Sequence, residues 1–547
     1  MAAVYPTHAA TPTIPEQPAV AAGRAVESRN PATGEVWKRY PSASRDDVFA
    51  AVRRARAAQP DWSAQPLALR VRALRRFHKS LYDRRKEVAD TLTSENGKPA
   101  AEALANEVAL ALDFARFYAG RAPWFLRAPW TGAVPLAMKR KRVRVVKDPF
   151  GVIGVISPWN YPLMLSAAIM LPALVTGNAV LLKPSEFTPT SGALLAALLH
   201  DAGVPEDACQ VLQGDGSTGA ALCDAPVDKI FFTGSDSSGR KVAMKCAERL
   251  VPCSLELGGS DAAIVLADAD VRHAANGIAW GRFSNAGQTC VAPKRLYVEA
   301  AVYEAFVAAL AETLKTLRVG SGKSLDTDVG PMIRPEAVAA LTAQRDDALL
   351  RGATMIAGAL PNTAVAGVHD SLDATSFFAP TVLVNVPPDA RVLHEETFGP
   401  LLPIVKVRDA DEAVALANAS EYGLAASIWS ADTARAARLA ERMEVGSVSI
   451  NDAIVTAGMA DVPHGGVKRS GLGRTHGMAG LEECVRTKAI VVDRFPAWRQ
   501  TWWFGYGARY AAGIDAFVRL AHGTTALERL RAVPPFLKLL LSPRPPA

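Results

Sequence analysis

One cysteine lies in a segment that suits a nucleophile. Cys290 ends the run Asn285-Ala-Gly-Gln-Thr-Cys290, whose small and polar residues let the chain approach a ligand and leave the sulfur accessible. A thiolate in such a place is a competent nucleophile. Because a single cysteine in a long chain is more often a buried apolar residue, the case for Cys290 depends on what accompanies it.

A carboxylate in apolar surroundings is the second candidate. Glu256 lies in Leu255-Glu-Leu-Gly-Gly259, at the end of a predicted strand. Burial among apolar groups raises the pKa of a carboxyl group and suits it to general-base catalysis. A strand-end glutamate paired with a helix N-terminus would have the same sequence, so both interpretations stay open.

Three polar segments each follow a predicted strand. In Pro158-Trp-Asn160-Tyr-Pro162, the Asn160 amide could donate a hydrogen bond to a developing oxyanion. Lys183-Pro-Ser-Glu186 offers a cation and a carboxylate for ribose hydroxyls, and Phe232-Thr-Gly-Ser235 precedes a helix that could receive a diphosphate at its N-terminus. None of them is a Gly-x-Gly-x-x-Gly motif, so the common dinucleotide signature is absent.

The elements that would position these segments alternate along the chain. Helical spacing of Ala and Leu predicts helices within residues 46–86 and 100–118. Strands joined by helical crossovers predict a parallel, doubly wound sheet with its ligand site at the carboxyl ends of the strands. A second alternating block, residues 300–451, predicts another α/β domain. The predicted strands of the first sheet are residues 152–156, 179–182, 210–212, 229–232 and 262–265.

In this order the segments resemble the aldehyde dehydrogenase superfamily, from about Arg29 to Val492. The combination is specific, because chance agreement over eight blocks is negligible. The likeness rests on Asn30-Pro-Ala-Thr-Gly34, Pro158-Trp-Asn160, Lys183-Pro-Ser-Glu186, Phe232-Thr-Gly-Ser235, Glu256-Leu-Gly-Gly259, Gly287-Gln-Thr-Cys290, Glu396-Thr-Phe-Gly-Pro400 and Gly465-Gly-Val-Lys-Arg-Ser-Gly471.

The resemblance implies an α/β protein of several parts. Residues 26–128 and 150–257 would form a doubly wound, parallel-sheet dinucleotide-binding domain, and residues 258–467 a second α/β catalytic domain. Residues 129–149 and 468–492 would form a small β extension that bridges the subunits of a homodimer or homotetramer. Residues 1–25 are expected to be a disordered leader, and residues 493–547 an additional C-terminal tail.

The resemblance also implies roles for single residues. Cys290 would attack the aldehyde, Asn160 and the Cys290 backbone amide would hold the oxyanion, and Glu256 would activate water to hydrolyse the thioester. Of the cofactor contacts, Lys183 and Glu186 would hold the adenosine ribose. No metal is expected. The full set of expected cofactor contacts is Ile156, Ser157, Pro158, Trp159, Lys183, Ser185, Glu186, Gly216, Phe232, Thr233, Gly234, Ser235, Leu257, Gly258, Glu396 and Phe398.

Glu186 also bears on the choice of dinucleotide. A carboxylate at the ribose accepts hydrogen bonds from a free 2′-hydroxyl but repels a 2′-phosphate. The sequence therefore favours NAD over NADP.

Three positions depart from the family pattern. Many relatives have Lys where this chain has Ser260, and some have a second glutamate where Thr475 follows Arg474. The second departure puts a two-carboxylate proton relay in doubt. His464 replaces a common Phe, and a surface or core role is expected for it rather than a catalytic one.

The composition of the chain indicates which partners to expect and in which compartment the protein acts. With 547 residues and 49% hydrophobic content, the chain should divide into two or three domains. The net charge is +7, and the tail alone supplies +5, from eight Lys or Arg against three Asp or Glu, so no nucleic-acid surface is expected. The basic run at 139–147 is interpreted as an exposed strand. Six cysteines without Cys-x-x-Cys spacing, and no signal peptide, favour the cytoplasm.

The tail is rich in aromatic residues. Trp498, Trp502, Trp503 and Phe504 lie close together, and Tyr506, Tyr510, Ile514 and Phe517 fall on one helical stripe with Asp515 and Arg519 opposite. A cationic amphipathic helix of this kind suits a membrane interface, although the charges prevent it from spanning a bilayer. Packing on the enzyme itself or on a neighbouring subunit is the alternative. If the tail contacts a membrane, long-chain aldehydes are the natural substrates.

The expected function is the irreversible oxidation of an apolar aldehyde to its acid. A semialdehyde dehydrogenase for a charged substrate such as succinic semialdehyde is the alternative, although the sequence places no arginine in a pocket. Transfer to coenzyme A is disfavoured, because Glu256 would then have little purpose. A catalytically silent, membrane-associated scaffold would lack Cys290 or Glu256, and both are present.

Overall fold

The computed structural model describes residues 25–135, 138–358, 368–369, 371–495, 500, 503–504 and 506–541. The predicted leader lies outside them, apart from residue 25. The chain divides into two compact units. The first comprises the residues up to Phe125 together with Pro149–Arg486, and the second comprises Leu126–Asp148 together with Thr487–Ala547.

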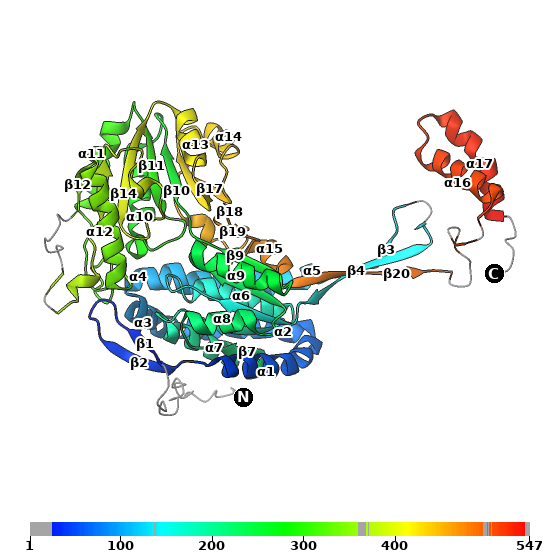
Figure 1. Ribbon diagram of the computed structural model, residues 1–547, viewed down its shortest axis with the longest axis horizontal. Coiled ribbons are helices and arrows are strands. Elements are labelled where there is room, and N and C mark those ends of the chain that lie inside the picture. The colour runs from blue at the N-terminus through cyan, green and yellow to red at the C-terminus, as the bar shows by residue number, and fades with distance from the viewer. Residues whose placement is uncertain are drawn as a thin grey trace, which may run out of the picture. The chain divides into compact units, whose positions relative to one another are not determined.

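A six-stranded sheet in the first unit carries the predicted cofactor segments (Figure 1). Four of its strands were predicted to within one residue at either end. Its edge strand β19 runs antiparallel to β9, pairing Gly471 with Glu256, and the other neighbours are parallel. In spatial order the strands are β19 (Gly471–Leu472), β9 (Cys253–Glu256), β8 (Lys229–Thr233), β5 (Val152–Ile156), β6 (Ala179–Lys183) and β7 (Cys209–Val211).

Helices surround this sheet on both sides. The helix α6 (Met164–Val175) is buried at every residue, because it lies between the strands β5 and β6 and the outer helices α2 (Leu67–Asp83) and α5 (Leu110–Phe125). The remaining helices are α1 (Arg45–Ala64), α3 (Arg85–Asn96), α4 (Ala100–Glu102), a π-helical stretch (Ala103–Ala109), α7 (Pro189–Asp201), α8 (Gly216–Asp224) and α9 (Asp236–Glu248).

The prediction for residues 262–265 was wrong about the sheet to which they belong. They form β10 (Asp261–Val265), which lies in a second sheet of seven strands. The antiparallel strand β19 pairs with the outer edge of β9, so no further parallel strand can join the first sheet there. In spatial order the second sheet is β12 (Thr354–Ala357), β13 (Thr381–Val384), β14 (Leu401–Val407), β11 (Pro293–Glu299), β10, β16 (Ala425–Trp429) and β17 (Ser447–Ile450).

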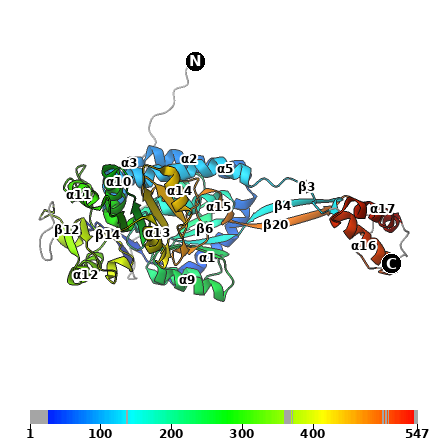
Figure 2. The same ribbon diagram turned by 90° about the horizontal axis from the view of Figure 1, so that it is seen from above.

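The second sheet has a separate core on each face. Ala263 and Val265 of β10 pack with α10 (Val271–Phe283), α11 (Tyr303–Leu314) and α12 (Pro335–Leu350). Ala262 and Ile264 point the other way, toward α13 (Ala410–Asn418) and α14 (Thr433–Ala440). Figure 2 shows the sheet between these two groups of helices. Such two-sided burial explains why residues 262–265 of β10 are all apolar.

Short elements complete the first unit. Two small sheets pair β1 (Ala25–Arg29) with β2 (Val36–Pro41), and β15 (Tyr422–Gly423) with β18 (Val467–Lys468). A six-residue helix, α15 (Gly477–Glu482), follows β19. Single 3₁₀ turns lie at Glu206–Ala208, Ser284–Gly287, Ala374–Ser376, Arg391–Leu393 and Val455–Ala457.

The second unit contains a three-stranded sheet in the order β20-β4-β3. Its strands are β3 (Thr131–Gly132), β4 (Lys141–Pro149) and β20 (Val485–Asp493). The second part of the predicted β extension, residues 468–492, therefore began too early. Residues 468–484 belong to the first unit, where β19 pairs with β9. The basic run lies mainly on β4, and the Asp493 carboxylate accepts hydrogen bonds from Lys141 and Arg140.

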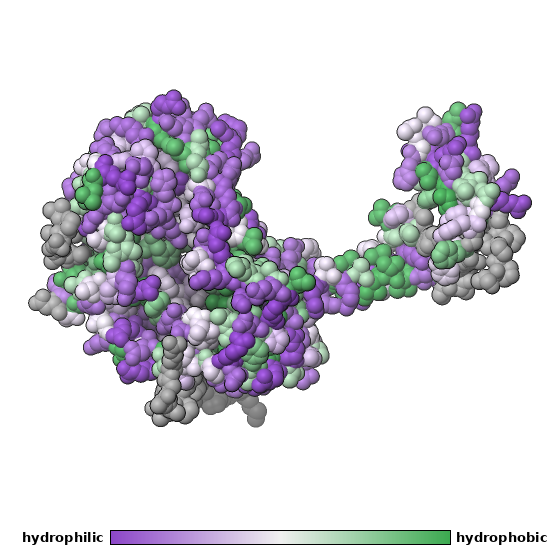
Figure 3. Space-filling view, in the orientation of Figure 1, coloured by the Kyte–Doolittle hydropathy of each residue, from purple (hydrophilic) through white to green (hydrophobic). Residues whose placement is uncertain are grey.

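Two helices of the tail, α16 (Ala508–His522) and α17 (Ala526–Leu541), pack against each other. Tyr506 precedes α16, and Asp515 forms an ion pair with Arg519 at 2.8 Å. Trp498 and Trp502 lie outside the described residues. In Figure 3 apolar residues reach the surface over β4 and β20 and on the helical pair. Within the described ranges, no helix has the length and apolar character needed to cross a bilayer.

Candidate active site

The segment before Cys290 is held in an unusual backbone conformation. After α10 ends, Asn285 and Ala286 adopt left-handed φ angles of 51° and 52°. Gly287 has a φ of 70°, and a Cβ atom there would lie 2.5 Å from the backbone of Gly399. Only glycine tolerates both conditions without strain. The small residues noted in the sequence therefore let this loop pack against the segment that follows Phe398.

The loop that carries Asn160 contacts the Cys290 loop directly. The Asn160 side-chain amide donates to the Gln288 backbone carbonyl at 3.0 Å, and the Asn160 backbone carbonyl accepts from the Asn285 side-chain amide at 3.0 Å. A buried ion pair holds the Asn160 loop in place. Lys98 Nζ donates to the Asn160 backbone carbonyl at 2.8 Å and to Glu107 Oε1 at 2.6 Å. Glu107 Oε2 in turn accepts from the two backbone amides at the start of α6.

We expect Lys98→Met to destabilise the fold strongly. Lys98 and Glu107 are both fully buried, so the substitution leaves the Glu107 carboxyl group in the interior without its cation and should lower the free energy of unfolding by about 3–5 kcal/mol. Urea denaturation measures the loss. Lys79→Met is the matched control, because Lys79 forms an exposed pair with Asp83. Equal stability of the two variants would contradict the structural role of Lys98.

Glu256 ends β9 and is buried, with 7% of its surface exposed. Its Oε1 atom accepts a hydrogen bond from Thr475 Oγ1 at 3.1 Å, and its Oε2 atom lies 3.7 Å from His464 Nε2. Burial raises the pKa of Glu256 to about 8, the direction expected from the sequence. Burial also raises the pKa of the Cys290 thiol to about 12, although the nearby Lys294 ammonium opposes this shift.

Cys290, Glu256 and Asn160 line one cavity of about 260 Å³. The reacting groups that separate motifs indicated therefore lie around a single pocket. Trp159 and Phe398 also line it, with their rings edge to face at 5.6 Å. The full lining is Pro158, Trp159, Asn160, Leu165, Ile169, Thr233, Gly234, Ser235, Glu256, Leu257, Gly258, Cys290, Glu396, Phe398, Leu424, His464, Thr475 and His476.

Nine of the expected cofactor contacts line this cavity, and the others lie along the strand ends that lead to it. Lys183 ends β6 and its Nζ atom lies 3.4 Å from Glu186 Oε2. Ser235 caps α9, and its hydroxyl oxygen accepts from the backbone amide of Ser238. The contacts outside the cavity lining are Ile156, Ser157, Lys183, Ser185, Glu186, Gly216 and Phe232.

The geometry of these residues fits a dinucleotide. A Cβ atom on Gly258 would lie 2.1 Å from Glu396 Oε2, so a side chain there would displace the carboxylate that accepts from the Gly259 amide. The Ser157 hydroxyl is buried and has no hydrogen-bond partner within the described part of the chain. Ser235, the N-cap of α9, lines the same cavity, so the first turn of this helix could receive a phosphate.

Comparison with known proteins identifies the family. A model of the aldehyde dehydrogenase family matches residues 19–490. The chain belongs to this family. It is 37% identical over 498 residues to 4,4′-diapolycopene aldehyde oxidase of Methylomonas sp, covering 91% of each chain. It is 40% identical over 462 residues to an NADP(+) succinate-semialdehyde dehydrogenase of Deinococcus radiodurans, covering 84% of this chain and 93% of that one.

Solved structures agree with the sequence comparison. The NAD-dependent aldehyde dehydrogenase of Sinorhizobium meliloti superposes with a TM-score of 0.82 at 34% identity, covering 88% of this chain and 94% of that one. The predicted α/β fold with parallel-sheet domains is therefore confirmed.

Sequence reasoning missed part of the site of this aldehyde dehydrogenase. Leu165, Ile169 and Leu424 supply an apolar wall that no motif indicated. His464 does not lie on the surface: it is 3% exposed, lines the cavity and faces Glu256. The sequence feature that could have indicated this role is the replacement of a common Phe by His464. His476, with none of its surface exposed, was missed entirely.

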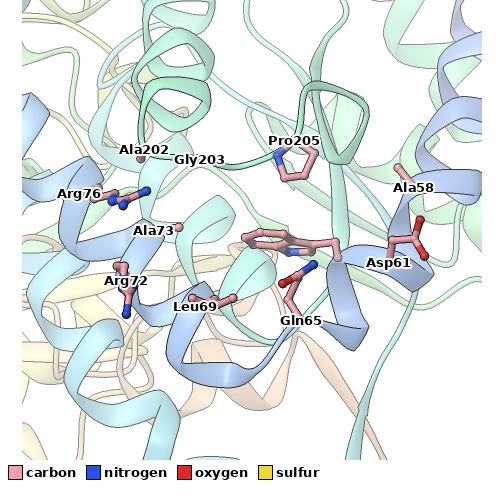
Figure 4. Close-up of a pocket in the computed structure, with 11 residues that line it drawn as sticks. Ala58, Asp61, Gln65, Leu69, Arg72, Ala73, Arg76, Ala202, Gly203 and Pro205 are labelled. Atoms are coloured by element: carbon pink, nitrogen blue, oxygen red, sulfur yellow. The ribbon is translucent and has the colours of Figure 1, made fainter.

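A second cavity lies away from this site. It has a volume of about 460 Å³ and is lined by α1, α2 and the segment after α7, including Trp62, Arg72 and Arg76 (Figure 4). None of the predicted catalytic or cofactor residues lines it. Size alone therefore does not identify the active site, whereas the convergence of a thiol, a carboxylate and an amide does.

Proposed function

We propose that this aldehyde dehydrogenase oxidises an aldehyde to the carboxylic acid through a thioester on Cys290. The observation that carries the proposal is the shared cavity of Cys290, Glu256 and Asn160. The same cavity reaches the expected dinucleotide contacts at Glu396 and Phe398. Nucleophile, base, oxyanion donor and hydride acceptor would then meet at one carbonyl carbon.

Covalent catalysis begins at Cys290. Its thiol loses its proton to solvent as the sulfur attacks the carbonyl carbon, and the Asn160 amide with the Cys290 backbone amide donates hydrogen bonds to the oxygen as negative charge develops there. When NAD(P) is bound, its nicotinamide would supply the hydride acceptor for oxidation of this adduct to the thioester. Trp159 and Phe398 enclose the reacting centre and limit its contact with bulk water.

Glu256 completes the reaction as the general base. Its carboxylate removes a proton from the water that attacks the thioester carbon. The new carbon–oxygen bond forms, the carbon–sulfur bond breaks, and Cys290 leaves as a thiolate that takes up the proton held by Glu256. A coenzyme-A-dependent route would not need this buried carboxylate, so its position favours hydrolysis.

Two substrate classes have support from different observations. The relatives favour the semialdehyde alternative, because several are named succinate- or glutarate-semialdehyde dehydrogenases. The cavity favours an uncharged substrate: the described residues that line it include no Lys or Arg, and Leu165, Ile169 and Leu424 form an apolar wall. One relative is named for diapolycopene aldehyde, an apolar compound. We therefore propose an apolar aldehyde and retain the semialdehyde as the second candidate.

A substrate panel tests both classes. NADH and NADPH formation would be measured with aldehydes from acetaldehyde to dodecanal and, in parallel, with succinic and glutaric semialdehyde. We expect kcat/KM to rise with chain length and to be lowest for the charged substrates. A preference for the semialdehydes would replace the apolar proposal, and no turnover of any aldehyde would refute dehydrogenase function.

The NAD preference inferred from Glu186 is not supported by the relatives, since those from Deinococcus radiodurans and Escherichia coli are named for NADP(+). We propose that Glu186, whose side chain is 37% exposed, tunes the choice. Glu186→Gln removes one negative charge facing a 2′-phosphate and should raise kcat/KM for NADP relative to NAD about 5- to 10-fold. Steady-state kinetics with both dinucleotides measures the ratio. An unchanged ratio would exclude this role.

The second unit supports two further proposals. We infer that β3, β4 and β20 join subunits into a dimer or tetramer, because Val145 and Val491 are exposed on this sheet. Analytical ultracentrifugation of the purified protein tests this proposal.

We also propose that the tail contacts a membrane surface, since Trp503 and Phe504 are 52% and 80% exposed. Flotation with anionic vesicles should decrease in Trp503→Glu/Phe504→Glu. Equal flotation would reject the membrane proposal.

A further inference from the structure

The two helices of the tail, α16 and α17, are held together by a small apolar core (Figure 1). A Cβ atom on Gly513 would lie 2.6 Å from Leu539 Cβ, so the close approach of the helices depends on glycine at this point. Ala532 is buried, and the rings of Phe517 and Phe536 lie 5.5 Å apart. Phe517, which the sequence placed on an outward stripe of α16, therefore belongs to the contact between the two helices.

The opposite side of α17 is apolar and exposed. Leu527, Leu530, Val533 and Leu537 each expose between 36% and 73% of their surface. At the α-helical rotation of about 100° per residue, their spacing places all four within an arc of about 120°. Leu539, which packs on Gly513, lies on the other side of the helix from the centre of this arc. We refer to the four exposed residues as the outer face of α17.

Basic side chains border the outer face of α17 along both edges. Arg529 lies at one edge, Arg531 and Lys538 lie at the other, and all three are exposed. Glu528, the single acidic residue in the sequence of α17, lies on the side of the hairpin core. Apolar side chains flanked by long cationic ones suit an interface at which the former enter the acyl region and the latter reach anionic head groups.

The length of α17 decides how it would meet a bilayer. Its 16 residues extend about 24 Å at the rise of an α-helix, which is less than the roughly 30 Å of a hydrocarbon core. The helix would therefore lie in the plane of the membrane surface. A protein partner would have to supply carboxylates opposite both basic edges, whereas a surface of anionic lipids presents acceptors on every side.

We propose that the outer face of α17 binds a bilayer surface rich in anionic lipids, with the helix axis parallel to the membrane. This inference rests on the proposed membrane contact of the tail and names the surface that makes it. Burial of Leu530 and Leu537, the central leucines of the face, supplies the apolar part of the binding free energy. Arg531 and Lys538 supply the dependence on lipid charge.

Vesicle binding by the full-length protein tests the outer face of α17. Flotation would be measured with vesicles of phosphatidylcholine alone and of phosphatidylcholine mixed with an equal part of phosphatidylglycerol. Leu530→Glu/Leu537→Glu should weaken binding to the mixed vesicles at least about 10-fold, because it places carboxylates where lipid contact is proposed. The matched control is Ala511→Glu/Ala512→Glu, which adds the same charge to exposed positions of α16. These positions lie on the far side of the hairpin, so screening by salt should keep its binding within about 2-fold of the unmodified protein.

A second variant tests the basic edges without altering the apolar residues. Arg531→Gln/Lys538→Gln should weaken binding to the mixed vesicles about 10-fold and leave binding to phosphatidylcholine unchanged. Equal binding of this variant and the unmodified protein to the mixed vesicles would contradict the preference for anionic lipid. Far-UV circular dichroism of each variant monitors the helices, and turnover of a soluble aldehyde such as propanal monitors the enzyme.

The outcomes distinguish this inference from the proposals on which it rests. Equal binding of the two double-glutamate variants would refute the outer face of α17 and leave the membrane contact of the tail standing. No binding of the unmodified protein to either vesicle would refute the membrane contact itself. Dissociation of an oligomer by Leu530→Glu/Leu537→Glu without lipid, measured by analytical ultracentrifugation, would show that a second copy of the chain covers this face and would overturn the proposal. Propanal turnover reports the chemistry at Cys290 separately from all of these results.

Discussion

Cys290→Ser is expected to abolish aldehyde oxidation, lowering kcat/KM by roughly 10³-fold or more. A serine hydroxyl is a far weaker nucleophile than a thiolate, and the Glu256 carboxyl, whose pKa is raised to about 8 by burial, is largely protonated at neutral pH. The variant should fold normally, because sulfur and oxygen differ little in size. NAD(P)H formation with the best aldehyde of the panel measures the loss.

Cys253→Ser is the appropriate control for that substitution. Cys253 lies on β9, three residues before Glu256, but does not line the cavity. A hydrogen bond from Cys246 lowers the pKa of the Cys253 thiol to about 7, whereas burial raises that of Cys290. Thiol reagents should therefore label Cys253 first, so substitution and not alkylation must identify the nucleophile. Full turnover by Cys290→Ser, or loss of turnover in Cys253→Ser alone, would contradict the assignment.

The first sheet could be predicted because its strands are short, apolar and bounded by turns. Val152–Ile156 and Lys229–Thr233 are buried strands whose polar successors carry the expected contacts. That regularity did not extend to β10, which has the same apolar character but belongs to the other sheet. Composition along one strand does not reveal its neighbours, and here an antiparallel strand from residue 471 decides the edge.

The part of the site that could not be predicted depends on contacts between distant segments. Thr475 and His464 reach Glu256 through a backbone bridge that no spacing in the sequence indicates. Lys98 is likewise an ordinary basic residue in the sequence, yet its buried ammonium holds the Asn160 loop. Motifs identified the groups that react, whereas the groups that orient them are visible only in the folded chain.

Glu256→Gln is expected to stop the reaction after acylation. The amide keeps the size of the side chain but cannot accept the proton of water, so thioester hydrolysis should fall about 10²- to 10³-fold. Acylation does not use this proton transfer, and a burst of product close to one equivalent per subunit should remain. Stopped-flow measurement of the burst and the steady phase separates the two steps. Glu441→Gln, at the exposed C-cap of α14, should leave both unchanged.

The pH dependence of hydrolysis gives an independent test of the same residue. Burial raises the pKa of Glu256 to about 8, so the carboxylate that acts as base is a minority form at pH 7 and the major form above pH 8. Steady hydrolysis should therefore increase as the pH is raised through about 8 and then level off. Burial lowers the pKa of His464 to about 4, so this histidine stays neutral throughout that range and contributes no titration near pH 8. In Glu256→Gln the rise near pH 8 should disappear. A rise of the same size in the variant would assign the titration to another group, and would remove Glu256 from the role of base.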